Sequence, residues 1–105
     1  MNRLKILIII SAVFSLSGCN AADNDFAVED HRDIASSAEI KICGKIEDMP
    51  KSQGIFRKRM PIDCEGEGSI RVRLANKREI YCRIGYVTPG LEQTFKFAIA
   101  DRQCR

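Results

Sequence analysis

The sequence predicts a small, mainly β domain, either a compact antiparallel sheet or an open five-stranded barrel, that is stapled by two disulfides. From Glu39 onward, apolar and polar residues alternate with a period of two, which is typical of half-buried strands. Clusters of turn-forming residues separate the alternating segments. Four cysteines lie in the same region, and an even number in a short exported domain indicates a disulfide framework. They are Cys43, Cys64, Cys82 and Cys104.

Residues 1–18 have the features of a cleaved signal peptide. Arg3 and Lys5 supply positive charge, Leu4–Phe14 is almost wholly apolar, and small residues close the segment. This order of charged, apolar and small-residue regions is that of a secretory signal. The apolar core is only about ten residues long, against the roughly 20 that a membrane-spanning helix needs. The segment is therefore not expected to be part of the fold.

The residues at the expected cleavage point, Leu16-Ser17-Gly18-Cys19, resemble the lipobox of bacterial lipoproteins. The resemblance implies cleavage before Cys19, a diacylglyceryl group on its thiol and acylation of the new amino terminus. Each buried CH₂ contributes about 0.8 kcal/mol, so several chains on one residue anchor a protein almost permanently. Asn20 stands where enteric-type lipoproteins that stay in the inner membrane have Asp. The resemblance therefore implies an outer-membrane anchor, with the domain facing the periplasm.

Residues 19–38 are expected to form a lipidated acidic tether. Between Asn20 and Ala38, five acidic residues stand against one arginine, and large apolar residues are few. Such a composition cannot bury enough surface to offset the entropy of ordering, so we expect a largely flexible segment with at most a short helix over Val28–Ser37. Nineteen extended residues would reach roughly 60 Å. That is enough to hold the domain, residues 39–105, clear of the lipid headgroups.

Alternation predicts four strands, and a fifth is expected over Ile55–Met60. The four alternating segments are Ile40–Ile46, Ile70–Leu74, Ile80–Ile84 and Phe95–Ile99. Breaks fall at Asp48–Gly54, Glu65–Gly68, Asn76–Arg78 and Thr88–Gly90. In the last break Pro fixes φ and Gly permits positive φ, as a type II turn requires. Short strands with turns at this spacing favour a small sheet or barrel.

The number of cysteines agrees with both a lipid anchor and a disulfide framework. The chain has five cysteines, and the use of Cys19 for lipid leaves an even four. Their wide spacing lacks the close pairs of zinc sites and of C-x-x-C redox motifs. Of three possible pairings, Cys43–Cys64 with Cys82–Cys104 is preferred because each closes a short loop, which stabilises by about 3 kcal/mol. Disulfides together with a lipobox indicate a Gram-negative periplasm.

One segment has a partial likeness to a calcium loop. Asp63–Ile70 carries acids at positions 1, 3 and 5 and glycine at position 6, as at the start of an EF-hand loop. Position 12 is Leu74, where the EF-hand requires a bidentate Glu, and the flanking residues alternate as strands do. An acidic β-turn is therefore expected, with no metal or cofactor.

Catalysis is poorly supported by the residues present. His31 is the only histidine, and it lies in the predicted tether. A nucleophile needs a base held at hydrogen-bonding distance, which a flexible linker cannot provide. The acidic residues cluster in turns, and nothing places two of them on facing strands. We therefore expect no enzymatic activity and no small-molecule substrate.

Basic residues predominate in the expected domain, where fourteen Lys and Arg face nine Asp and Glu. Those with a candidate binding role are the run Arg57, Lys58 and Arg59 and the outward-facing Arg71, Arg73 and Arg83. Like charges side by side destabilise a sheet, which suggests an anionic partner such as an acidic protein surface or lipid phosphate. The alternative is a solvated polar face, partly neutralised by Glu79 and Asp63. Nucleic acid is not an expected partner in the periplasm.

These observations together favour a binding role. We expect an envelope-anchored lipoprotein that acts as a non-catalytic binding or inhibitory module on another envelope protein. In format it resembles phage superinfection-exclusion proteins, plasmid exclusion proteins and periplasmic immunity proteins. The alternative is a pilotin-like or accessory assembly lipoprotein of a secretion or pilus system.

Overall fold

The computed structural model describes residues 23–105, and within this range the chain is mainly β, as predicted, and contains no helix. The predicted signal peptide and Cys19 lie outside the described residues. The strands are β1 (Asp23–Glu29), β2 (Ala35–Ile42), β3 (Lys45–Asp48), β4 (Lys51–Ser52), β5 (Ile55–Pro61), β6 (Gly66–Leu74), β7 (Glu79–Val87), β8 (Thr94–Ala100) and β9 (Gln103–Cys104).

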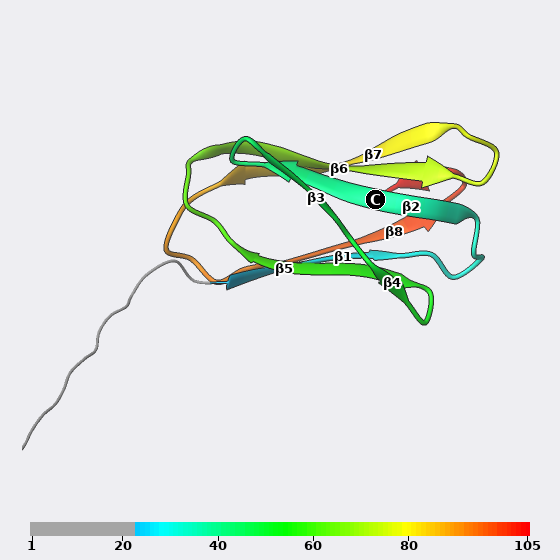
Figure 1. The fold of residues 1–105 in the computed structure, drawn as a ribbon, viewed down its shortest axis with the longest axis horizontal. Coiled ribbons are helices and arrows are strands. Elements are labelled where there is room, and N and C mark those ends of the chain that lie inside the picture. Colours follow the sequence, from blue (N-terminus) through cyan, green and yellow to red (C-terminus); the bar gives the residue numbers. More distant parts are fainter. Residues whose placement is uncertain (1–22) are drawn as a thin grey trace, which may run out of the picture.

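The strands form two sheets that face each other across a common core (Figure 1). One sheet has the order β4-β5-β1-β8-β9 and the other the order β3-β2-β6-β7. All pairings are antiparallel except that of β1 with β8, which is parallel. The architecture is thus a two-layer sandwich, where the alternation of residues had favoured one sheet or one open five-stranded barrel.

Strand β1 lies in the segment that was expected to be a flexible tether. From Asp23 onward that expectation is wrong. β1 lies in the middle of its sheet, between β5 and β8. Phe26 and Val28 of β1 are 0% exposed. The short helix expected over Val28–Ser37 is not formed either, because β1 continues to Glu29 and β2 begins at Ala35.

The acidic residues of β1 occupy its outer face, and that is why they do not prevent the strand from being buried. Successive side chains of a strand point to opposite faces, so Asp23 and Asp25 alternate with the inward Asn24 and Phe26. Arg59 of β5 lies 3.6 Å from the Asp23 carboxylate and 3.7 Å from that of Asp25. The acidic segment and a residue of the basic run therefore neutralise each other across neighbouring strands.

Three tight hairpins set the register of the short strands. Cys43–Gly44, Gln53–Gly54 and Asp101–Arg102 are two-residue connections in which both residues have positive φ, the backbone of a type I′ turn. Gly44 and Gly54 adopt this conformation without steric cost. The first turn also reverses the chain between Ile42 and Ile46. Ile46 consequently lies opposite Lys41 and points outward, although simple alternation had placed it inside.

The core fills the space between the sheets. The rings of Phe26 and Phe95, neighbours on β1 and β8, are stacked with their centroids 5.1 Å apart. Full burial of such side chains stabilises the fold by about 1.5–3 kcal/mol each. The largest fully buried apolar residues are Phe26, Phe56, Ile40, Ile42, Ile62, Ile70, Val28, Val72 and Val87.

Two disulfides join the elements, and the preferred pairing is confirmed. Cys43 is bonded to Cys64 and Cys82 to Cys104, with Cα–Cα distances of 5.5 and 5.1 Å. The first ties the β2–β3 turn to the connection before β6. The second joins β7 in one sheet to β9 in the other, so it closes one side of the sandwich.

Candidate functional site

The outer face of the four-stranded sheet carries most of the exposed large apolar side chains. The exposed fractions are 61% for Ile46 of β3, 56% for Tyr81 of β7 and 63% for Tyr86 of β7. Leu91, in the β7–β8 loop, is the fourth such residue of the described chain. Ile46 and Tyr81 flank a shallow hollow of about 300 Å³, whose remaining lining is Glu39, Lys41, Ser69 and Arg71.

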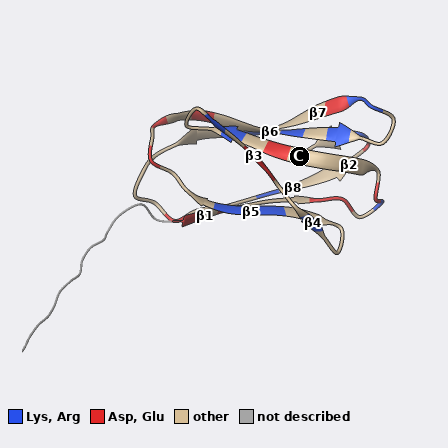
Figure 2. Ribbon diagram, in the orientation of Figure 1, with Lys and Arg blue, Asp and Glu red and all other residues tan. Residues whose placement is uncertain are grey.

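Three arginines share this face, as the alternation predicted. The register pairs Arg71 with Tyr81, Arg73 with Glu79 and Ser69 with Arg83, so these side chains stand on the same side of β6 and β7. We call the surface made by Ile46, Arg71, Arg73, Tyr81, Arg83 and Tyr86 the tyrosine–arginine face. Figure 2 shows Lys and Arg positions on β6 beside Asp and Glu positions at the start of β7 and on β2.

Each arginine on this face has a carboxylate partner. Arg71 contacts Glu39 and lies 3.7 Å from Glu79, while Arg73 Nη2 lies 2.9 Å from Glu79 Oε2. Arg83 lies 3.7 Å from Glu67. The hydrogen bond from Arg73 lowers the pKa of Glu79 and raises that of Arg73. These ion pairs offset the like-charge repulsion that suggested an anionic partner.

The basic run on β5 does not join this face. Arg57 and Arg59 are exposed on the outer side of the other sheet, and Arg59 pairs with the acids of β1. Lys58 points the other way and forms an ion pair of 2.9 Å with Glu47 of β3. The six basic residues proposed from sequence thus do not share one surface. Lys58 connects the two sheets through its ion pair with Glu47, and the other five divide between the two outer faces.

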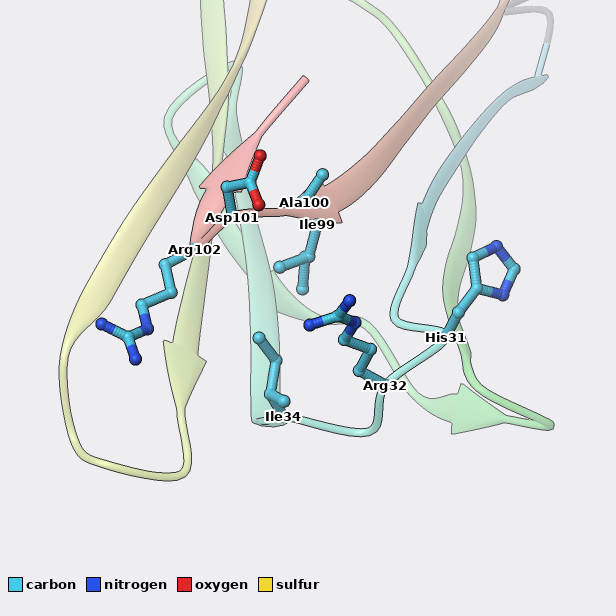
Figure 3. Close-up of a pocket in the computed structure, with 7 residues that line it drawn as sticks. All are labelled: His31, Arg32, Ile34, Ile99, Ala100, Asp101 and Arg102. Atoms are coloured by element: carbon cyan, nitrogen blue, oxygen red, sulfur yellow. The ribbon is translucent and has the colours of Figure 1, made fainter.

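A second hollow, of about 610 Å³, lies where the β1–β2 turn meets the β8–β9 turn (Figure 3). Ile34 and Ile99 line it, and Arg32 extends between them in the view. His31 also lines it, on an ordered turn and not on a flexible linker. Its ring points away from the other labelled side chains, and Nε2 lies 3.2 Å from the Glu29 carboxylate. Among the described residues that line the hollow, none is a serine, threonine or cysteine that could act as a nucleophile beside the histidine.

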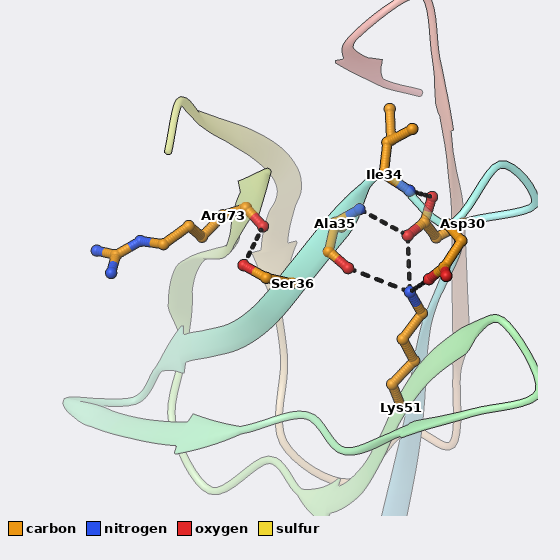
Figure 4. Close-up of polar contacts among 7 residues, drawn as sticks. Asp30, Ile34, Ala35, Ser36, Lys51 and Arg73 are labelled. Carbon is orange, nitrogen blue, oxygen red and sulfur yellow. Dashed lines mark hydrogen bonds and ion pairs between the residues drawn. The ribbon is translucent and has the colours of Figure 1, made fainter. Parts of the chain in front are cut away.

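The strongest polar cluster beside this turn is structural. Asp30, 1% exposed, accepts hydrogen bonds from the backbone N–H groups of Ile34 (3.0 Å) and Ala35 (2.8 Å) and from Lys51 Nζ at 2.9 Å (Figure 4). Lys51 also binds Asp33 at 2.5 Å. Burial would raise the pKa of Asp30, but these hydrogen bonds outweigh it and hold the pKa below the ordinary 3.8. Both carboxylate oxygens of Asp30 accept hydrogen bonds, and Lys51 Nζ donates to Asp30, Asp33 and the carbonyl of Ala35.

One group of possible metal ligands is present in the described chain, at Cys43, Asp63 and Cys64. Both sulfurs are joined in a disulfide, so neither is the thiolate that a metal site requires. The segment that resembled a calcium loop becomes strand β6 from Gly66 onward. Its acids already have partners: Glu65 accepts a hydrogen bond of 2.8 Å from the Tyr86 hydroxyl, and Glu67 faces Arg83. That hydrogen bond raises the pKa of Tyr86.

Sequence reasoning found Arg71, Arg73 and Arg83 but did not single out the aromatic part of the face. Tyr81 could have been found, because it lies out of phase with the partly buried Ile80 and the buried Cys82 and Ile84. The outward position of Ile46 depends on the Cys43–Gly44 turn, which alternation does not reveal. Within residues 23–105, no helix has the length and apolar character needed to cross a bilayer. No family model matches the chain, and neither a curated protein nor a solved structure is significantly similar to it.

Proposed function

We propose that this chain is an outer-membrane lipoprotein, acylated at Cys19, that acts as a non-catalytic binding or inhibitory module on another protein of the bacterial envelope. The sandwich is the rigid scaffold, and the tyrosine–arginine face is the surface that meets the partner. The anchor is supported by the lipobox-like residues before Cys19 and by the charged and apolar segments that precede them.

The observation that carries the proposal is the composition of the tyrosine–arginine face. Tyr and Arg are enriched in protein interfaces and among the residues that dominate binding energy. Here Ile46, Tyr81 and Tyr86 are more than half exposed beside three arginines. The carboxylate partners hold the arginine side chains in defined positions, which reduces the entropy lost when a partner binds.

The proposed partner is a protein surface of mixed character and not a strongly anionic one. The arginines of the face already pair with Glu39, Glu67 and Glu79, so its positive charge is largely balanced. A mixed apolar and polar surface offers burial for the tyrosine rings and hydrogen bonds for the guanidinium groups. The exclusion or immunity type of inhibitor fits this role, since such a module has to recognise one protein specifically.

Partner capture tests the face. The protein would be crosslinked in cells, purified, and compared with the double variant Ile46→Ser/Tyr81→Ser and with the matched control Arg57→Ser/Lys96→Ser on the other sheet. All four residues are exposed, so each substitution should change stability by no more than about 0.5 kcal/mol. Loss of two interface contacts worth above 1 kcal/mol each should lower partner recovery by at least about tenfold.

The control variant should recover the partner at the level of the unaltered chain. Equal recovery by the Ile46→Ser/Tyr81→Ser variant, or loss confined to the control, would reject the face. Cells that express the protein alone should be protected against the excluded or toxic agent. Mislocalisation of a secretin in cells that lack the protein would instead indicate an assembly factor of the pilotin type.

A further inference from the structure

The connection between the proposed anchor and the sandwich is very short. Only Asn20, Ala21 and Ala22 separate Cys19 from Asp23, the first residue of β1. A fully extended chain spans at most about 3.5 Å per residue, so Cys19 lies within about 14 Å of the start of the strand. β1 cannot unwind beyond its first residue without exposing Asn24, and then Phe26, which are 1% and 0% exposed.

The β7–β8 loop lies at the same end of the sandwich as the start of β1 (Figure 1). Two hydrogen bonds fix it there: the backbone N–H of Asp25 donates to the carbonyl of Gln93 at 3.0 Å, and the N–H of Gln93 donates to Asn24 Oδ1 at 2.8 Å. The residues from Thr88 to Gln93 are all exposed. Leu91, 49% exposed, is the large apolar side chain of this loop.

We propose that the β7–β8 loop rests on the membrane that holds Cys19, with Leu91 buried among the lipid headgroups and upper acyl chains. This inference rests on the lipidation in the proposed function. It makes the loop a lipid-contacting surface and sets the orientation of the molecule. The sandwich stands on the end where β1 begins, and the tyrosine–arginine face is presented sideways, toward a partner in or near the same membrane.

The contact is apolar and not electrostatic. The charged residues at this end include the acids Asp23, Asp63, Glu65 and Glu92 and the bases Lys45 and Arg59, which already lie beside Asp63 and Asp23. Anionic headgroups would therefore not attract it. A single leucine binds a bilayer only weakly, but a short covalent link keeps the local lipid concentration high, and weak contacts then form readily. The contact should consequently be insensitive to salt.

The chain contains no tryptophan, so a single introduced one reports its own surroundings. The lipidated protein would be placed in vesicles of phosphatidylethanolamine and phosphatidylglycerol that contain acyl-brominated phosphatidylcholine, a quencher of tryptophan fluorescence. Leu91→Trp reports the loop. Arg78→Trp, also at an exposed position, reports the β6–β7 hairpin at the opposite end of the sandwich.

The proposal predicts that brominated lipid quenches the Leu91→Trp emission by about twofold or more, since an interfacial side chain lies about 5–10 Å into the headgroup and acyl boundary. Arg78→Trp should be unaffected. Ten added Gly and Ser residues between Ala22 and Asp23 should weaken the quenching of Leu91→Trp. Equal quenching at both positions, no quenching at Leu91→Trp, or quenching unchanged by the longer link would each overturn it.

Failure of the proposed function would be recognised separately. The mass of the mature amino-terminal peptide shows whether Cys19 is acylated, and flotation shows whether the protein is bound to the vesicles. A protein without acyl chains that does not float would reject the anchor itself. An acylated protein that floats but leaves Leu91→Trp unquenched would reject only the contact of the loop.

Discussion

At the scale of single residues, Asp30 is the clearest case of a buried charge that the fold has fully matched. Its carboxylate joins the start of β2, through the N–H groups of Ile34 and Ala35, to Lys51 on β4. Lys51 also lies over the ring of Phe56, 5.0 Å from its centroid. The cluster therefore connects β1, β2, β4 and β5 at one end of the sandwich.

Removal of the Asp30 charge should destabilise the protein strongly. Asp30→Asn leaves Lys51 with a partner missing, and loss of one member of a buried pair costs about 3–5 kcal/mol. Asp33→Asn is the matched control, because Asp33 also binds Lys51 but its side chain is 85% exposed; its cost should be about 0–1 kcal/mol. Urea unfolding of both variants measures the difference. Equal losses would show that burial of Asp30 does not matter.

The same residue predicts a weakening of the fold in acid. The pKa of Asp30 in the folded protein lies below its ordinary value of 3.8. The stabilisation that the charged carboxylate gives the folded state is therefore fully present above pH 3.8, and it is lost as pH falls through the folded pKa. The stability gap between the unaltered protein and Asp30→Asn should be constant from neutral pH down to about 5 and then shrink. Unfolding free energies over a pH series test this. A gap that persists undiminished in strong acid would contradict it.

At the scale of elements, alternation identified the longer strands and composition misjudged β1. Segments such as Ile70–Leu74 show a clear period of two, and they are strands. The same period exists in Asp23–Glu29, but its outward positions are mostly acids and its inward positions include Asn24. Net charge over the segment therefore suggested a tether. The burial of β1 depends on its pairing with β5, including Arg59, which is distant in sequence. The residue pattern of Asp23–Glu29 alone therefore does not reveal that burial.

Phe26 tests whether β1 is a core strand. Truncation of a fully buried phenylalanine leaves a cavity, so Phe26→Ala should lower stability by about 3–5 kcal/mol. Asp25→Ala on the outer face of the same strand should cost no more than about 1 kcal/mol. Thermal melts of the two variants would separate them clearly. If Phe26→Ala melts like the unaltered protein, the segment is a tether after all.

The disulfides make a prediction at the same scale. Each closes a loop with a sequence separation of 21 or 22 residues, which by the chain-entropy model contributes about 3 kcal/mol. Reducing agent should therefore lower the melting temperature sharply, and alkylation of the native protein should find no free thiol at the four cysteines. An unchanged melt, or peptide mapping with a different pairing, would contradict the structure.

At the scale of the whole molecule, acidic and basic residues pair across neighbouring strands and do not form separate acidic and basic segments. The sequence suggested an acidic tether and a basic domain, whereas the structure joins Asp23 and Asp25 to Arg59 and balances the arginines of β6 with Glu39 and Glu79. The arginines of the candidate site could be predicted because alternation fixes which side chains share a face. The pairing that neutralises them, and the exposure of Ile46, depend on strand order and turn geometry, which the sequence pattern does not contain.

The central claim is that the protein binds its partner through the tyrosine–arginine face, and site-specific photo-crosslinking tests it most directly. A photo-crosslinking amino acid would be placed in living cells at Tyr81, on the tyrosine–arginine face, and at Lys96, on the outer face of the other sheet. Both sites are exposed strand positions, so the two proteins should fold alike. If the partner binds the tyrosine–arginine face, a discrete adduct with one envelope protein should form from position 81 and none from position 96. An adduct from position 96 alone, or none from position 81 in cells where the protein is active, would contradict it.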